Sequence, residues 1–106
     1  MSLDVWLTFE GNSVFEGNLT HNLNRMAEEA GLYYAIWRPC EVGANRAFDI
    51  APSLIDGLRF MKRNRDFLVR FNHENGYGCF DDLERFVESY LVSCLVWPDA
   101  KISVHR

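Results

Sequence analysis

The two ends of the chain carry the same pattern, and this pattern constrains the fold more than any other feature of the sequence. In residues 3–9 apolar side chains alternate with polar or mixed ones, and residues 101–105, Lys-Ile-Ser-Val-His, alternate again. Alternation with a period of two residues is typical of a strand that buries one face. We expect the last strand to pair with the first, so that both termini belong to one sheet.

The middle of the chain has helical spacing instead. Leu23, Met26, Ala27 and Ala30 recur at intervals of three and four residues, which places them on one face of a helix. Gly31 follows at the position where a helix C-cap is expected. The sequence therefore predicts a first helix that ends at this glycine.

Further apolar stripes predict more helical segments after this break. Pro52 fits the first turn of one of them. Gly57 lies in its middle and indicates close packing, because glycine weakens a helix by about 1 kcal/mol relative to alanine. Asp81 or Asp82 can cap the last segment. The predicted segments cover residues 32–37, 50–61, 67–71 and 83–94.

This order of elements predicts one α+β domain over residues 1–106, with a small antiparallel sheet packed against about four helical segments. Residues 10–12, Glu-Gly-Asn, have the chemistry of a turn, and residues 13–16 are a candidate second strand of a hairpin. A chain of 106 residues buries roughly 65% of its unfolded surface, which is enough for one core. The aromatic fraction of 14% also indicates a folded chain.

Composition excludes several classes of protein. The formal net charge of -4 argues against a nucleic-acid partner, because phosphate binding needs clustered Lys and Arg. No apolar run approaches 18 residues and no signal peptide is visible, so we expect no membrane partner. The three cysteines are not closely spaced, which favours reduced thiols and a cytoplasmic location. Neither metal-ligand spacing nor a phosphate-binding glycine loop is present, so no metal or cofactor is expected.

The polar run NLTHN, residues 18–22, precedes the first helix and has two interpretations. Thr20 or Asn18 can cap the helix by accepting from a free amide. Alternatively, the helix N-terminus, His21 and Asn22 bind an anionic ligand together. His21 is an odd choice for capping alone, because imidazolium is disfavoured at the positive end of a helix.

Two other polar stretches could join this corner. In Trp-Arg-Pro, Arg38 could bind a carboxylate or phosphate with its planar guanidinium. The alternative is that Trp37 lies in the core and Arg38 pairs with Glu41. In the loop of residues 72–78, Asn75 and Tyr77 could close over a ligand, or the asparagines and glycines could simply form tight turns.

These motifs resemble a family of small uncharacterised proteins of bacteriophages, prophages and bacteria. The family pattern runs N-[IL]-T-H-N-L, then W-R-P, then N-G-[WY]-G, and the similarity covers nearly the whole chain. Tyr77 and Cys40 replace the family's usual Trp and Glu. The resemblance implies no activity, but it implies a bacterial host cell and emphasises these motif residues: Asn18, Thr20, His21, Asn22, Trp37, Arg38, Pro39, Asn75, Gly76 and Gly78.

We therefore expect a binding protein for a small anionic or nucleotide-like ligand, more than an enzyme. Together with size, the phage resemblance suggests a counter-defence protein that sequesters a host nucleotide. The alternative is a protein–protein interaction module or homo-oligomeric structural protein, which contacts a host protein or another copy through Trp6 and Trp97. A third hypothesis makes His21 a general base. The expected ligand-binding residues are Asn18, Thr20, His21, Asn22, Trp37, Arg38, Asn75 and Tyr77.

Overall fold

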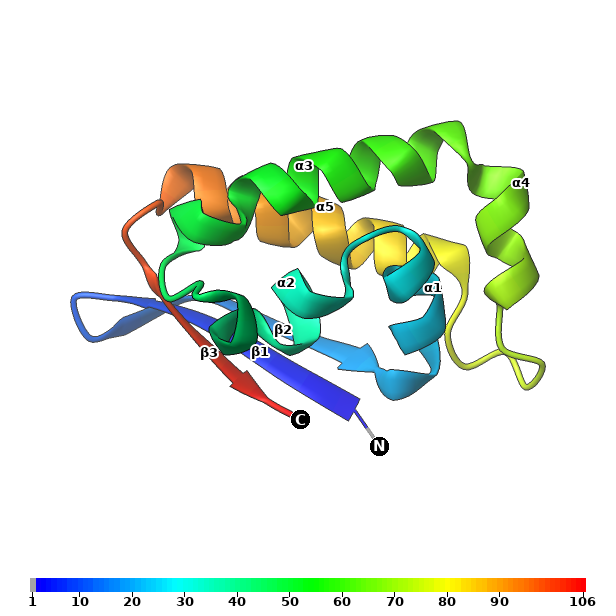
Figure 1. The fold of residues 1–106 in the computed structure, drawn as a ribbon. Helices are drawn as coiled ribbons and strands as arrows, with labels where there is room; N and C mark the ends of the chain where they lie inside the picture. The colour runs from blue at the N-terminus through cyan, green and yellow to red at the C-terminus, as the bar shows by residue number, and fades with distance from the viewer. Residues whose placement is uncertain (1) are drawn as a thin grey trace.

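In the computed structural model, which describes residues 2–106, a three-stranded antiparallel sheet lies under a layer of helices (Figure 1). The strand order is β2-β1-β3, so the first strand lies in the centre and pairs with the last one. The α+β fold and the pairing of the terminal strands are as predicted from the sequence. The strands are β1 (Ser2–Phe9), β2 (Asn12–Thr20) and β3 (Lys101–His105).

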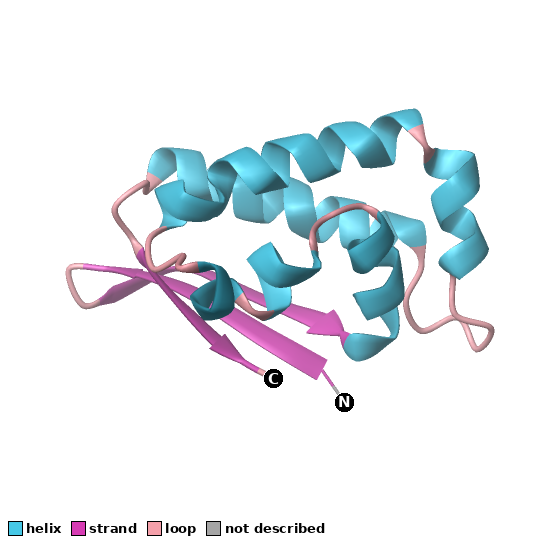
Figure 2. Ribbon diagram, in the orientation of Figure 1, coloured by secondary structure: helices cyan, strands magenta, loops and turns pink. Residues whose placement is uncertain are grey.

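The helices follow β2 and precede β3 along the chain. Figure 2 shows them in cyan on one side of the magenta sheet. Short 3₁₀ turns extend or join them: η1 (His21–Leu23), η2 (Pro39–Val42) and η3 (Val69–Phe71). The helices are α1 (Asn24–Glu29), α2 (Tyr33–Trp37), α3 (Ala47–Arg63), α4 (Arg65–Leu68) and α5 (Phe80–Val96).

Burial alternates along β1 as its sequence predicts. Leu3, Val5 and Leu7 are fully buried under the helices. Asp4 and Trp6, between them, are only partly buried and point to the other face. Within residues 2–106, the sheet therefore has one face in the core and one face that no helix covers (Figure 1).

The hairpin between β1 and β2 is longer than the sequence suggested. Glu10 and Gly11, with φ of 52° and 80°, form the two-residue loop, which matches the twist of the flanking strands. The second strand was predicted over residues 13–16 only, but it runs on to Thr20. The first three residues of NLTHN, from Asn18 on, are therefore strand residues. Only His21 and Asn22 lie in the following 3₁₀ turn.

Helix α3 corrects one prediction and confirms another. It begins at Ala47, so Pro52 lies inside the helix instead of in its first turn. The helix starts early because the carboxylate of Asp49 accepts hydrogen bonds from the backbone N–H groups just before it, which also lowers the pKa of Asp49. Gly57 is closely packed as predicted, because a Cβ atom added there would collide with Leu32.

Helix α5 supplies one apolar face of the helical layer. It packs against α3 and against β2. Its inward side chains recur at helical spacing, as the sequence predicts, and they are Phe80, Leu83, Phe86, Val87, Tyr90 and Cys94. Asp82 lies in the first turn of α5, and its carboxylate accepts from the N–H of the N-cap residue Cys79 at 3.1 Å. It ends before Trp97 and Pro98, as expected.

Candidate functional site

The NLTHN segment joins the end of β2 to the 3₁₀ turn η1, which precedes α1. Thr20 is the N-cap residue, and its hydroxyl accepts from the N–H of Asn22 at 3.3 Å. On the strand side, Asn18 Nδ2 donates to Asp4 Oδ1 at 2.7 Å across the β1–β2 pair. Thr20 is therefore a capping residue, but of the 3₁₀ turn η1 and not of α1, whose N-cap residue Leu23 forms no side-chain cap. Asn18 ties two strands together instead of capping a helix.

His21 contacts the Trp-Arg-Pro segment directly. Its Nδ1 accepts a hydrogen bond from the indole Nε1 of Trp37 at 3.0 Å. Trp37 is buried, and its ring stacks on Tyr33 with centroids 5.7 Å apart. The bond therefore satisfies a buried indole N–H, which otherwise would be costly.

Arg38 turns away from this contact. Its Nε donates to the hydroxyl of Tyr33 at 2.9 Å, and its Nη1 lies 2.7 Å from Glu41 Oε2. These hydrogen bonds, the one to Glu41 first, raise the pKa of Arg38 above its usual value, so the group stays cationic. This is the arrangement that we gave as the alternative to ligand binding.

The loop of residues 72–78 contacts NLTHN through one hydrogen bond. Asn22 Nδ2 donates to the backbone oxygen of Tyr77 at 3.0 Å. Within the loop, Asn75 Oδ1 accepts from the N–H of Tyr77 at 2.9 Å and lies 2.7 Å from His73 Nδ1. The ring of Tyr77 is 73% exposed, so it stands clear of this network.

The three polar segments thus meet, with NLTHN between the other two, but many of their polar atoms bond to one another. Arg38 points to Tyr33 and Glu41 instead of to His21 or Asn75. Two separate hollows divide the expected residues, because Asn18 and Thr20 line one beside β2 and Trp37 lines another beside β3. A small ligand bound at this corner stays a prediction.

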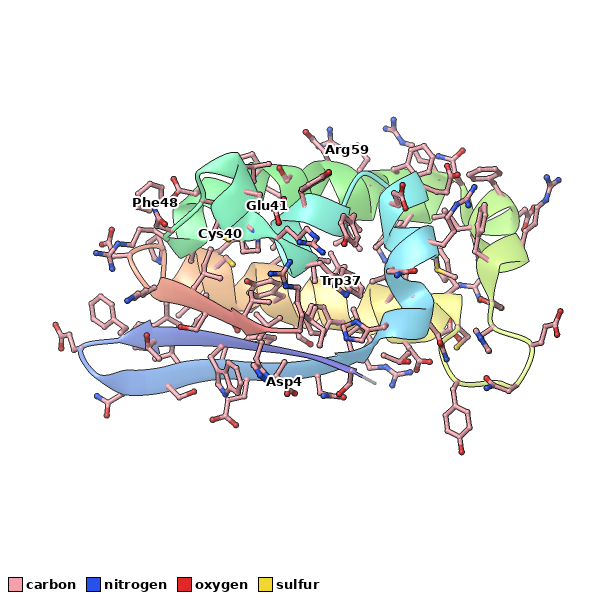
Figure 3. All side chains as sticks on the ribbon, turned by 60° about the horizontal axis from the view of Figure 1, so that its bottom comes forward. Asp4, Trp37, Cys40, Glu41, Phe48 and Arg59 are labelled. Atoms are coloured by element: carbon pink, nitrogen blue, oxygen red, sulfur yellow. The ribbon has the colours of Figure 1, made fainter. Side chains whose placement is uncertain are left out.

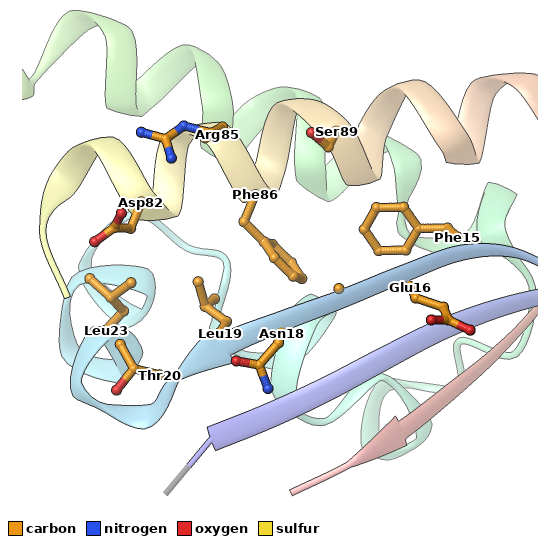
Figure 4. A pocket seen from close by; sticks show the side chains of 11 residues that line it. Phe15, Glu16, Asn18, Leu19, Thr20, Leu23, Asp82, Arg85, Phe86 and Ser89 are labelled. Carbon is orange, nitrogen blue, oxygen red and sulfur yellow. The ribbon is translucent and has the colours of Figure 1, made fainter. Parts of the chain in front are cut away.

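A different site lies beside β2, where a groove of about 360 Å³ runs between the strand and α5 (Figure 4). We call it the edge groove. Phe86 points from α5 toward the strand, while Arg85 and Ser89 stand on the helix above it. The wall that β2 supplies is the strand itself over residues 15–20. The edge groove is lined by Phe15, Glu16, Gly17, Asn18, Leu19, Thr20, Leu23, Asp82, Arg85, Phe86 and Ser89.

A second hollow, of about 310 Å³, lies on the uncovered face of the sheet and adjoins the same strand. We call it the outer hollow. Asp4, which belongs to it, is drawn on the side of the sheet away from Trp37 (Figure 3). The outer hollow is lined by Asp4, Trp6, Glu16, Gly17 and Asn18. Both hollows thus share the middle of β2.

The hydrogen bonds of β3 fix the direction of the backbone groups in the sheet. Ile102 donates its N–H to the oxygen of Asn45 at 3.0 Å, so its backbone groups point away from β1. Leu7 is the partner of Ile102 on β1. Because pairs alternate between bonded and non-bonded along an antiparallel ladder, Leu7 and Val5 direct their backbone groups to β2 instead.

The same alternation identifies the backbone groups at the free edge of β2. Val5 pairs with Gly17, so Gly17 bonds to β1, and its neighbours Glu16 and Asn18 point their N–H and C=O groups outward. Within residues 2–106, no backbone–backbone hydrogen bond outside the sheet involves residues 16–19. The edge groove therefore contains strand donors and acceptors that another strand can use.

Gly17 gives this part of the edge its shape. A Cβ atom added there would lie 2.6 Å from Phe86 Cε2 and 2.9 Å from Phe15 Cζ. Without a side chain at this position, the two rings cover the strand, with their centroids 6.1 Å apart in an edge-to-face arrangement. The sequence drew attention to Asn18 and Thr20 in this groove but to neither Gly17 nor Arg85.

A metal site and a membrane-spanning helix are two further possibilities for the described part of the chain. Across residues 2–106, no group of three or more His, Cys, Asp or Glu side chains is placed to hold a metal ion. In the same range, none of the helices combines the length and apolar character needed to cross a membrane.

Comparison with known proteins identifies no family. No family model matches the chain, and no curated protein or solved structure matches it either. The resemblance to small phage and bacterial proteins therefore stays a prediction.

Proposed function

We propose that this protein is an interaction module that binds an extended peptide segment of a partner protein along the free edge of β2. The single observation that carries this proposal is the position of the edge groove. An edge strand with outward N–H and C=O groups at Glu16 and Asn18 forms one wall of a groove, and α5 forms the other. Peptides that add a strand to a sheet use this arrangement, with backbone hydrogen bonds for affinity and pockets for specificity.

The dimensions of the groove suit such a segment. Residues 15–20 extend for about 20 Å at the usual rise of a strand, which is room for a short peptide strand. The edge is not blocked by proline, and the irregularity in the β1–β2 ladder lies between Leu7 and Thr8, next to the hairpin loop. Pairing along the regular part leaves the fold as it is.

The test compares two substitutions at one position. Asn18→Pro removes the outward N–H, and proline is tolerated on edge strands where that N–H faces solvent. Asn18→Thr removes the same side-chain amide but keeps the N–H, so it is the matched control. Circular dichroism and melting temperatures establish that both variants fold.

Displayed libraries of short random peptides are then selected on the wild-type protein. The expected result is a set of peptides that bind the wild type and Asn18→Thr similarly and bind Asn18→Pro about tenfold or more weakly. Peptides that bind Asn18→Pro as well as Asn18→Thr overturn the proposal. So does a wild-type dimer that Asn18→Pro dissociates, because the edge is then covered by a second copy.

A small anionic ligand at the NLTHN corner is the second candidate, and the contacts of His21 with Trp37 and of Asn22 with Tyr77 favour it. They bring three polar segments together, and Arg38 supplies a cation nearby on the chain. The nucleotide-sequestering role expected from the sequence belongs to this candidate. Thermal-shift measurements with nucleotides and with inorganic phosphate test it. A rise in melting temperature that Arg38→Ala abolishes supports it, and no rise with any of them removes it.

A further inference from the structure

We infer that the segment bound at β2 has two differently charged sides, with acidic residues toward α5 and basic residues toward the uncovered face of the sheet. This inference rests on the proposed function and names the chemistry of the partner. It follows from the two hollows that meet at β2.

Successive side chains of a strand point to opposite faces of its sheet. A strand added at the edge of β2 therefore places every second side chain in the edge groove and the others beside the outer hollow. Both hollows include Glu16, Gly17 and Asn18. The same short stretch of partner thus contacts both, and the two hollows differ in charge.

On the α5 side the available charge is positive. Arg85 is exposed, and it forms no ion pair within residues 2–106. Asp82, the acidic group that α5 contributes to the same groove, accepts from the backbone N–H and the thiol of Cys79 at 3.1 and 3.3 Å. Its carboxylate keeps its charge but is held against Cys79 at the start of α5. Arg85 remains as the charge that can pair with an acidic partner side chain.

On the uncovered face the available charge is negative. Glu16 lies directly opposite Trp6 in the β1–β2 register. The nearby carboxylate of Asp4 accepts from Asn18 at 2.7 Å. A lysine or arginine that reaches over this face meets a carboxylate and the indole of Trp6 together, and both attract a cation.

Because the charged groups lie on two different faces of the sheet, each side can be tested with its own substitution. Arg85→Glu changes the charge on the α5 side. Glu16 lines both hollows, but its side chain lies on the same face as that of Trp6 opposite it, so Glu16→Lys changes the charge of the uncovered face. Arg59 and Glu28 are exposed and lie in α3 and α1, outside both hollows. Arg59→Glu and Glu28→Lys therefore alter the net charge by the same amounts and are the matched controls.

The experiment selects the same displayed peptide library on the wild type and on these four variants. Wild-type peptides are expected to have acidic residues at alternate positions and basic residues between them. Arg85→Glu is expected to remove only the acidic preference, and Glu16→Lys only the basic one. Each change weakens a wild-type peptide by about two- to fivefold, as for exposed cross-strand ion pairs. The controls keep both preferences.

Peptides that depend on the N–H of residue 18 but show no alternation of charge overturn this inference and leave the proposed function standing. A loss of both the acidic and the basic preference in Arg85→Glu or in Glu16→Lys also overturns it, because the two sides of the bound peptide are then not recognised independently. If no peptide distinguishes Asn18→Thr from Asn18→Pro, the proposed function itself fails.

Discussion

The ring of Phe86 lies so close over Gly17 that a Cβ atom added to the glycine would sit 2.6 Å from Phe86 Cε2. Phe86 is only 8% exposed and is wedged edge-to-face against Phe15 and Tyr90. The ring therefore has little room to move. This contact holds α5 over β2 and sets the floor of the edge groove.

Gly17→Ala is expected to destabilise the protein by about 1–3 kcal/mol, the usual range for overpacking a core. The added methyl group has to displace either Phe86 or Phe15. Urea unfolding followed by circular dichroism measures the change in the free energy of unfolding. Ser13→Ala, at an exposed position of the same strand, is the control and should change it little. Equal stability of Gly17→Ala and the wild type would show that the rings yield freely.

At Tyr90 the removal of a group, and not its addition, is the informative change, because the side chain has a buried hydroxyl. It is fully buried, and its hydroxyl has no hydrogen-bond partner within residues 2–106. Burial also raises the pKa of Tyr90 above its usual range. Tyr90→Phe removes the unpaired hydroxyl, so we expect a gain of about 1 kcal/mol in the free energy of unfolding.

A control is available in a second tyrosine. The hydroxyl of Tyr33 accepts from Arg38, so Tyr33→Phe is expected to lower the free energy of unfolding by about 0.5–1.5 kcal/mol. Thermal melts of both variants beside the wild type give the comparison. A loss of stability in Tyr90→Phe similar to that in Tyr33→Phe would mean that the Tyr90 hydroxyl is paired.

The hydrogen bond between Trp37 and His21 links two polar motifs, and its contribution is measurable. His21→Ala leaves a buried indole N–H without an acceptor, and we expect a loss of about 1–3 kcal/mol. In a Trp37→Phe background the same substitution should be nearly neutral, because the donor is absent. A double-mutant cycle from urea unfolding gives the coupling energy. Additive effects would contradict the structural role of His21.

Cys94 gives the protein a specific sensitivity to alkali. It is buried, and burial raises the pKa of its thiol from 9.0 to about 12. The neutral thiol therefore stabilises the folded state fully below the unfolded pKa, and this stability is lost as the pH rises from about 9 toward about 12. Because alanine has no thiol to ionise, Cys94→Ala should lose less stability over this range than the wild type does. Parallel curves of unfolding free energy against pH would contradict the prediction.

Elements with an uninterrupted pattern of apolar residues were predicted correctly from the sequence, and elements without one were not. The terminal strands β1 and β3 and the helix α5 were predictable because their apolar residues follow one period without interruption. Strand β2 was not, because glycine occupies the inward position between Phe15 and Leu19 and breaks the alternation. The start of α3 was missed because its N-cap residue is Arg46, which is not a typical capping residue.

The candidate site was predictable only in part, for a different reason. Thr20 could be assigned a capping role from its position before a helical turn, whereas the partner of His21 is Trp37, sixteen residues away. The edge groove depends on the order β2-β1-β3 and on the packing of α5, which join residues far apart in the chain. No local pattern marks Arg85 or Glu16 as members of one site.

The most direct test of the account is hydrogen exchange at the backbone N–H groups of the sheet, measured by NMR with and without a selected peptide. If a partner strand pairs with β2, exchange at Glu16 and Asn18 should slow strongly on binding, because these groups face the free edge. Gly17 already bonds to β1 and should change much less. Binding that leaves exchange at Glu16 and Asn18 unchanged would contradict strand addition at this edge.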